Sequence, residues 1–252
     1  MFTIITLLCL FGMVTLPSIG NILAYPVSVK MSSKISNYIV KKCSPRVFSI
    51  LRCYKHFVCW NYYESKKVPE QFVLISNHQS LLDIPVIVNF FNEKEVRFIA
   101  KDKLGRHIPL VSEMLRTQKH CLIPRKAKPM DSMNLISEFG KRVLVENQIP
   151  VIFPEGTRTK NGDVGKFYSA GFRNICESSG LPVVVCALDG GYRLRDLKKI
   201  FVNLKRGSYR IKVVKVFDSP KTKDDCLSIL EESKVLIQNQ LNEWRSLPLS
   251  VK

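Results

Sequence analysis

The chain has 252 residues, of which 39 are Lys or Arg and 21 are Asp or Glu, so its formal net charge is +18. This length predicts one domain, or one domain with an appendage. With 46% hydrophobic and 24% charged residues the chain can bury a core, which excludes an intrinsically disordered protein. No segment repeats, which excludes solenoids and propellers. The positive charge favours an anionic partner: nucleic acid, a membrane surface or a phosphorylated substrate.

The N-terminal stretch from Phe2 to Val29 contains no charged side chain. A helix needs roughly 20 apolar residues to cross a bilayer. The densest apolar run, Phe2 to Leu16, is shorter than that, and Pro17, Gly20 and Pro26 are expected to interrupt the remainder of the stretch. We expect a membrane-inserted or re-entrant segment. A signal peptide is an alternative, although no basic region precedes the apolar run, and a buried core helix is another.

Basic residues come after this stretch: Lys30, Lys34, Lys41, Lys42 and Arg46. Such residues favour the cytoplasmic side of a membrane and bind anionic lipid head groups. The mixed apolar and basic segment Val47 to Tyr63 then predicts an interfacial helix, with an amphipathic core helix as the alternative. We therefore expect residues 1–66 to form an N-terminal membrane-inserting and interfacial helical segment, and residues 67–252 to form a separate catalytic domain.

In the second part, short apolar runs alternate with helical patterns. The expected strands are Phe72–Ser76, Val96–Ala100, Cys121–Pro124, Pro150–Pro154, Pro182–Leu188 and Ser208–Phe217. The expected helices are Leu82–Phe91, Gly105–Leu115, Met130–Val145, Lys166–Ser178 and Lys223–Trp244, the last with a capping box of Thr222 and Asp225. The order predicts an α/β fold: a mixed, largely parallel central sheet with helices on both faces, preceded by an N-terminal membrane-associated helical segment. In such sheets, functional groups lie just beyond the carboxyl ends of strands.

The eight cysteines include no CxxC pair and no Cys/His cluster with zinc spacing. Several lie within apolar runs, where a free cysteine packs as a small hydrophobic residue. We therefore expect a reducing compartment and no structural metal.

The first strand runs directly into Asn77-His78-Gln79-Ser80-Leu81-Leu82-Asp83. A histidine that removes a proton from a hydroxyl needs a partner on its other ring nitrogen, and a carboxylate there fixes the tautomer. The spacing of His78 and Asp83 allows such a pair. Alternatively, Asp83 is the N-cap of the next helix, or Ser80 and Asp83 form a capping box, and His78 is an ordinary loop residue.

The fourth strand is followed by Pro154-Glu155-Gly156-Thr157-Arg158. Gly156 would let the backbone approach a ligand, and the guanidinium of Arg158 suits a phosphate. The alternative is a turn with a surface ion pair between Glu155 and Arg158. Arg125 and Lys101 lie just past the ends of two other strands. Singly each is expected to be a solvated charge, but together these cations predict a phosphate site.

The two motifs, Asn77 to Asp83 and Phe153 to Arg158, in this order resemble those of the glycerophospholipid acyltransferases, and among them the 1-acyl-glycerol-3-phosphate (lysophosphatidic acid) acyltransferases. The resemblance extends from about Phe72 to Leu188. It departs from the family before Arg125, where the family often has an acidic residue and this chain has Pro124.

The resemblance implies a role for each matching residue. His78 would be the general base and Asp83 would orient it. Glu155, Gly156, Thr157 and Arg158 would bind the glycerol phosphate acceptor, with Arg158 on the phosphate. Arg125 stands where the family has the arginine of its second motif, and Lys101 would be a further phosphate contact.

The resemblance also implies a reaction. A fatty acyl group would move from an acyl thioester to the sn-2 hydroxyl of 1-acyl-glycerol-3-phosphate, giving phosphatidic acid. A thioester is already activated, so no cofactor or metal is expected, and acyl-CoA or acyl carrier protein would be the co-substrate. Because no GxSxG motif occurs, we expect direct transfer without an acyl-enzyme. The expected partners are membrane lipids, lysophosphatidic acid and the thioester donor, with the catalytic domain at the cytoplasmic face of a membrane.

Two alternatives stay open. An enzyme of the same fold could use glycerol-3-phosphate or another lysophospholipid, and the motifs do not separate these acceptors. A basic module that binds a membrane surface or nucleic acid without catalysis is the other. The sequence contains no helix-turn-helix, RNP motif or zinc finger, so we do not expect a nucleic-acid partner.

Overall fold

The computed structural model describes residues 2–51, 58–62, 68–106, 112–124, 126–194, 203 and 208–246. Within these ranges one sheet has the strand order β1-β7-β6-β2-β5-β3-β4. Its strands are β1 (Val58–Tyr62), β2 (Val73–Ser76), β3 (Val96–Lys101), β4 (Cys121–Ile123), β5 (Ile149–Ile152), β6 (Val183–Asp189) and β7 (Ser208–Phe217). Strands β6 and β7 pair antiparallel, and the other neighbours pair in parallel. The expected mixed, largely parallel sheet is confirmed.

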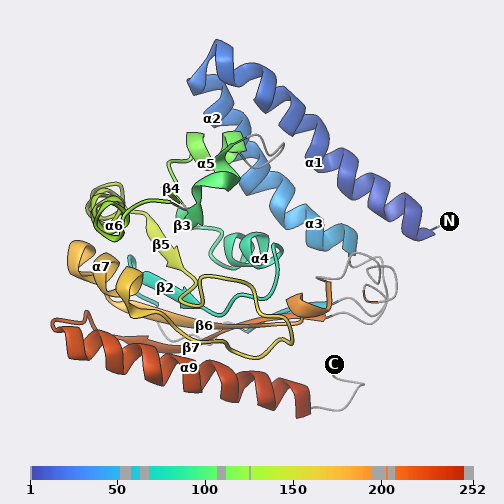
Figure 1. Ribbon diagram of the computed structural model, residues 1–252. Helices are drawn as coiled ribbons and strands as arrows, with labels where there is room; N and C mark the ends of the chain where they lie inside the picture. The colour runs from blue at the N-terminus through green and yellow to red at the C-terminus, as the bar shows by residue number, and fades with distance from the viewer. Residues whose placement is uncertain are drawn as a thin grey trace.

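Helices cover both faces of this sheet (Figure 1). They are α1 (Phe2–Val27), α2 (Val29–Tyr38), α3 (Ser44–Leu51), α4 (Asp83–Phe90), α5 (Ser112–Thr117), α6 (Pro129–Val145), α7 (Ser169–Ser179) and α9 (Lys223–Ser246). Short helical turns span Ile39–Cys43, Asp102–Gly105 and Gly191–Leu194. Helices α6, α7 and α9 lie on one face, and α4 lies on the other, beneath the N-terminal helices.

Alternation along the central strands builds the two cores. In β2 the side chains of Val73 and Ile75 pack with α6, α7 and α9, whereas Leu74 packs with α4. All three are fully buried. Successive strand residues point to opposite faces, so a strand buried on both sides is expected to be apolar on both, as β2 is from Val73 to Ile75.

All six expected strands are present, but the sheet has a seventh that the sequence did not predict. The helix expected over Val47 to Tyr63 is wrong in its second half, because α3 ends at Leu51 and Val58–Tyr62 forms β1. Strand β1 pairs in parallel with β7, so its backbone hydrogen bonds come from a segment distant in sequence. That pairing outweighs a local pattern of mixed apolar and basic residues.

The later helices differ from expectation mainly at their starts. Helix α5 begins at Ser112, after a turn over Asp102–Gly105, and residues 107–111 lie outside the described ranges. Helix α7 begins at Ser169 rather than Lys166. The capping box of α9 is confirmed. The Thr222 N–H donates to Asp225 Oδ2 at 2.8 Å, and the Asp225 N–H donates to Thr222 Oγ1 at 3.1 Å.

Helix α1 runs without a break through Pro17, so the expected interruption is wrong. Residues Ile4–Val27 are long and apolar enough to span a membrane, with a mean hydropathy of 1.9. The exposed side of α1 is apolar: Leu8, Phe11 and Leu16 are 64%, 67% and 72% exposed. This distribution is the reverse of that expected for a helix in water and is consistent with association with a membrane.

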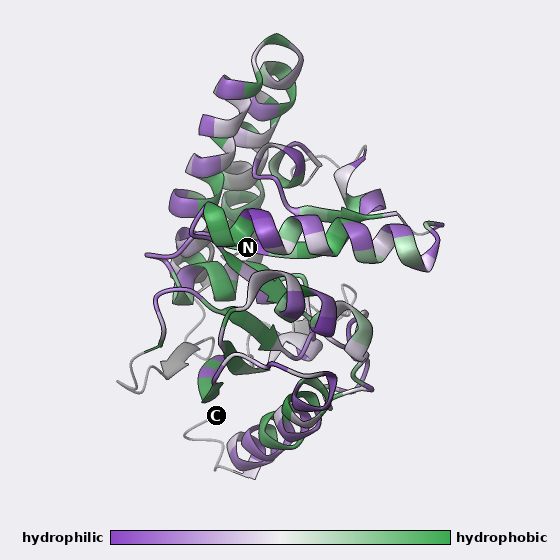
Figure 2. Cartoon of the chain, turned by 90° about the vertical axis from the view of Figure 1, so that its left-hand side faces the viewer, coloured by the Kyte–Doolittle hydropathy of each residue, from purple (hydrophilic) through white to green (hydrophobic). Residues whose placement is uncertain are grey.

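The buried side of α1 is polar and holds α2 against it. Asn21 donates from Nδ2 to Ser36 Oγ at 2.9 Å and accepts a hydrogen bond from Ser32. The Ser36 Oγ lies 2.7 Å from Thr117 Oγ1 of α5. Figure 2 shows α1 and α2 as a column that rises from the rest of the molecule. Asn21 thus joins α1 to α2 within the column, and Ser36 joins the column to α5.

Candidate active site

The predicted site residues gather at the carboxyl edge of the parallel strands. His78 comes just after β2, Glu155 comes just after β5, and β2 lies between β5 and β6 in the sheet. The Thr159 N–H donates to the His78 carbonyl oxygen at 2.8 Å, so the two motif loops are bonded to each other. Neighbouring parallel strands end at one edge, which is why two motifs distant in sequence meet there.

His78 and Asp83 form the expected pair. The His78 Nδ1 lies 2.6 Å from Asp83 Oδ2, with the imidazole 16% exposed and the carboxylate fully buried. Asp83 Oδ2 also accepts the backbone N–H groups of Gln79 at 2.7 Å and Ser80 at 2.9 Å. These bonds satisfy Oδ2 of the buried carboxylate and hold it in place. With the Nδ1 proton directed to Asp83, the lone pair of Nε2 is available as a base.

The structure also tests the two alternatives for Asp83, an N-cap of α4 and a capping box with Ser80. The N-cap of α4 is Leu82, and Asp83 is the first helical residue. Of the capping box, only the return bond from the Ser80 N–H to Asp83 is present, because the Ser80 hydroxyl accepts from the Leu82 N–H instead. Asp83 therefore anchors the loop that precedes the helix, and it holds His78 in the same position.

Glu155 lies in the motif loop but is buried, with 4% of its surface exposed. Its Oε1 accepts the His78 N–H at 2.8 Å and its Oε2 accepts the Gly165 N–H at 2.9 Å. Burial raises the pKa of Glu155, while these two bonds lower it in part. The turn with a surface ion pair is wrong, because this carboxylate faces inward and joins the His78 loop to the backbone at Gly165.

The rest of that loop faces solvent. Gly156, Thr157 and Arg158 are exposed, and Gly156 has a φ of +63°, a conformation that favours glycine. Lys101 is also exposed, at the end of β3. Arg125 lies outside the described residues. The structure thus leaves the side chains of Arg158 and Lys101 at the edge of the sheet where His78 lies.

Aromatic rings support the imidazole. The ring of His78 stacks on Phe153 with centroids 4.1 Å apart, and Phe153 stacks on Phe98 at 6.3 Å. Phe153 is the first residue after β5, and Phe98 lies within β3. Stacking on one side and the carboxylate on Nδ1 together fix the plane of the imidazole.

Comparison with known proteins shows the family of the chain. The family model described as "Acyltransferase" matches residues 59–189, which include both motifs. The chain belongs to the Acyltransferase family. The match begins within β1 and ends at the last residue of β6, so the family region comprises most of the sheet together with the site.

Three relatives carry the name 1-acyl-sn-glycerol-3-phosphate acyltransferase. The chain is 30% identical over 156 residues to the protein of Cocos nucifera, covering 60% of this chain and 46% of the relative. It is 31% identical to that of Helicobacter pylori over 51% of this chain and 52% of the relative. It is 29% identical to the human beta protein over 52% of this chain and 46% of the relative. The matched region thus spans about half the length of these relatives.

The fold of this chain is also found in a solved structure. The 1-acyl-sn-glycerophosphate (LPA) acyltransferase of Thermotoga maritima superposes with a TM-score of 0.65 and 21% identity, over 98% of this chain and 99% of the other. The superposed length includes the N-terminal helices. The likeness therefore extends the fold beyond the region that the family model matches.

A polar cluster behind His78 was not predicted from the sequence. The Nε2 of Gln79, a buried residue, donates to the Gly162 carbonyl at 3.0 Å and to Asp189 Oδ1 at 3.2 Å. Arg245 of α9 binds the same groups, at 2.9 Å from Asp189 Oδ1 and 2.7 Å from the Gly162 oxygen, and pairs with Asp163 at 2.7 Å. The C-terminal helix is thereby tied to both motif loops.

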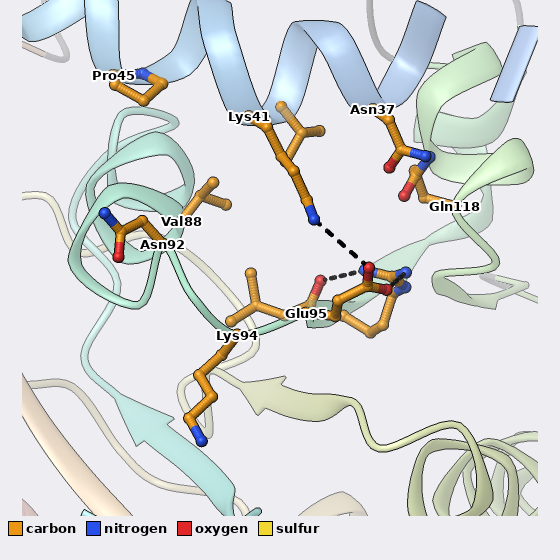
Figure 3. Close-up of a pocket in the computed structure, with 11 residues that line it drawn as sticks. Asn37, Lys41, Pro45, Val88, Asn92, Lys94, Glu95 and Gln118 are labelled. Carbon is orange, nitrogen blue, oxygen red and sulfur yellow. Dashed lines mark hydrogen bonds and ion pairs between the residues drawn. The ribbon is translucent and has the colours of Figure 1, made fainter. Parts of the chain in front are cut away.

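A cavity lies away from this cluster. It measures about 50 Å³ and lies between the N-terminal helices and the sheet domain, lined by residues that include Asn37, Lys41, Glu95 and Gln118 (Figure 3). The Lys41 Nζ lies 3.7 Å from Glu95 Oε1 across it. An exposed ion pair of this length contributes little stability.

Within the described residues, no three His, Cys, Asp or Glu side chains gather as metal ligands would.

Proposed function

We propose that the chain transfers a fatty acyl group from an acyl thioester to the sn-2 hydroxyl of 1-acyl-glycerol-3-phosphate, giving phosphatidic acid. The observation that carries the proposal is the His78–Asp83 pair, 2.6 Å apart, bonded to the loop that presents Arg158. The names of the relatives support the choice of acceptor.

The geometry supports general-base catalysis. The Nε2 of His78 takes the proton of the sn-2 hydroxyl as its oxygen attacks the thioester carbonyl carbon. Asp83 accepts the Nδ1–H bond and stabilises the imidazolium that forms. The tetrahedral intermediate then breaks its carbon–sulfur bond, and the imidazolium returns the proton to the leaving thiolate. The transfer changes no oxidation state, so it needs no oxidant or reductant.

The acceptor phosphate is proposed to lie against the exposed cations at the site edge. Arg158 offers two N–H groups to a phosphate, and the backbone at Gly156 is open, since a Cβ there would meet no atom within 4 Å. Lys101 lies at the end of β3, which pairs with β5. Glu155 holds His78 and the loop rather than the acceptor itself, and Thr157 is exposed beside Arg158.

The N-terminal column is proposed to place this site at a membrane, with the site on the cytoplasmic side. The apolar outer face of α1 supports insertion, and exposed lysines such as Lys41 and Lys42 come after it. Lysophosphatidic acid and phosphatidic acid are both lipids, so an enzyme acting on them gains from residence at the bilayer. Residues 1–66 and 67–252 remain our proposed division of the chain, although strand β1 of the first part pairs with β7 of the second.

The test is an acceptor screen with the detergent-purified full chain. Labelled acyl-CoA and acyl carrier protein are each offered with lysophosphatidic acid, glycerol-3-phosphate and lysophosphatidylcholine, and products are identified by mass spectrometry. We expect phosphatidic acid from lysophosphatidic acid. Product from another acceptor alone would replace the proposed substrate. No product from any acceptor with folded protein would contradict catalysis of this kind.

A further inference from the structure

Tyr209 is a fully buried tyrosine at the start of β7. Strand β7 runs antiparallel to β6, and Asp189 at the end of β6 pairs with Arg210 of β7. The first residues of β7 therefore lie at the edge where the parallel strands end. This topology brings Tyr209 to the motif loops, although it lies 126 residues after Asp83.

The hydroxyl of Tyr209 donates a hydrogen bond to Asp83 Oδ1. The other oxygen, Oδ2, takes the bonds from His78 Nδ1 and from the N–H groups of Gln79 and Ser80. A carboxylate with no exposed surface needs hydrogen-bond donors on both oxygens, because a buried oxygen without a donor carries a large desolvation cost. Bonds on both oxygens also fix the rotation of the carboxylate, and that rotation decides whether Oδ2 faces the imidazole.

The backbone opposite Tyr209 is shaped around its hydroxyl. A Cβ built at Gly191 would clash with the tyrosine oxygen and lie 2.9 Å from both Tyr209 Cζ and Ser80 Cβ. Real Cβ atoms do not approach other atoms this closely, so a side chain at this position would displace the phenol or the loop. Gly191 therefore leaves the space in which the hydroxyl reaches Asp83.

We propose that Tyr209 is a positioning residue of the His78–Asp83 pair. Its hydroxyl holds the Asp83 carboxylate aligned with the imidazole. The inference rests on the proposed function, because it assigns His78 the part of the base. Glu155 is the other titratable group that faces the pair, through its bond to the His78 N–H. Tyr209 acts from the opposite side, on the carboxylate.

The experiment compares wild type with Tyr209→Phe and Gly191→Ala in the full chain, with Tyr38→Phe, an exposed tyrosine of α2, as the control. Both site variants should lower kcat about tenfold, a fraction of what a general base contributes, with an unchanged KM for lysophosphatidic acid. Loss or displacement of the phenol lets the Asp83 carboxylate turn away from the imidazole, so the imidazolium is stabilised less. The acid limb of the pH–rate profile should therefore move about 0.5–1 pH unit to lower pH.

The outcomes separate this inference from the proposed function. If wild type itself forms no phosphatidic acid, the proposed function fails. If wild type is active and folded Tyr209→Phe keeps its rate and its pH profile, the positioning role is overturned. A lower kcat with an unmoved acid limb in both variants, or loss of folding in both, would assign Tyr209 and Gly191 a role in stability alone. Either result would also overturn the inference.

Discussion

His78 and His120 lie on one series of stacked rings but differ in what their Nδ1 atoms bind. His78 stacks on Phe153, Phe153 on Phe98, and Phe98 on His120 at 5.8 Å. At His78 the Nδ1 faces the carboxylate of Asp83. At His120 the Nδ1 accepts the backbone N–H of Phe98 at 2.8 Å.

The partner of Nδ1 decides what each histidine can do. A carboxylate stabilises the imidazolium, so His78 can take up a proton during a reaction. A backbone donor needs the neutral ring, and burial together with Arg97 and Arg142 lowers the pKa of His120 to about 3. His120 thus stays neutral and closes a backbone hydrogen bond, although both rings stack on phenylalanines.

The largest effect is expected when the Asp83 carboxylate, which distinguishes His78 from His120, is removed. Asp83→Asn should lower kcat by about 10²–10⁴-fold, because the amide neither fixes the tautomer nor stabilises the imidazolium. Steady-state kinetics and a thermal melt measure the effect. Full activity in the folded variant would reduce Asp83 to an anchor of its loop.

The next effect concerns the acceptor rather than the base. Arg158→Ala should raise the KM for lysophosphatidic acid by about 10–100-fold, since bonds to charged groups contribute about 1.5–3 kcal/mol, and should leave kcat nearly unchanged. Lys160→Ala, a neighbouring exposed cation, is the control. An unchanged acceptor KM would remove Arg158 from the phosphate site.

A smaller effect is expected from the cluster behind His78. Arg245→Ala removes the guanidinium that Asp189 and the Gly162 carbonyl share with Gln79, and should lower kcat about three- to tenfold together with the melting temperature. Arg173→Ala, which breaks an exposed pair with Glu177, is the matched control. If both variants behave alike, α9 does not support the loops.

The smallest effect concerns His120. The pKa of His120 is lower in the folded than in the unfolded chain, so the unfolded chain binds a proton first as pH falls below about 6.5. Stability is therefore lost from there towards pH 3. His120→Asn keeps an acceptor but does not titrate. Its stability should fall less than that of wild type, by about 1–3 kcal/mol between pH 6.5 and 4.5. Parallel denaturation curves over that range would contradict the assignment.

The features that the sequence predicts are local, and those it does not predict depend on pairing across the fold. The β2–loop–α4 segment holds both His78 and Asp83, so spacing alone places them together, and the apolar runs of β2 and β6 directly indicate strands. Strand β1 and Tyr209 depend on pairing with distant segments. The resemblance implies that Glu155 binds the acceptor, and the structure bonds its carboxylate to the His78 and Gly165 N–H groups. A sequence motif does not reveal which way a carboxylate turns.

The most direct test of the central claim assays wild type, His78→Ala and His120→Asn side by side with lysophosphatidic acid and labelled acyl thioester. Wild type and His120→Asn should form labelled phosphatidic acid at similar rates, while folded His78→Ala forms none above background. Wild-type activity in folded His78→Ala would contradict the account, because the reaction would then proceed without the base on which it depends.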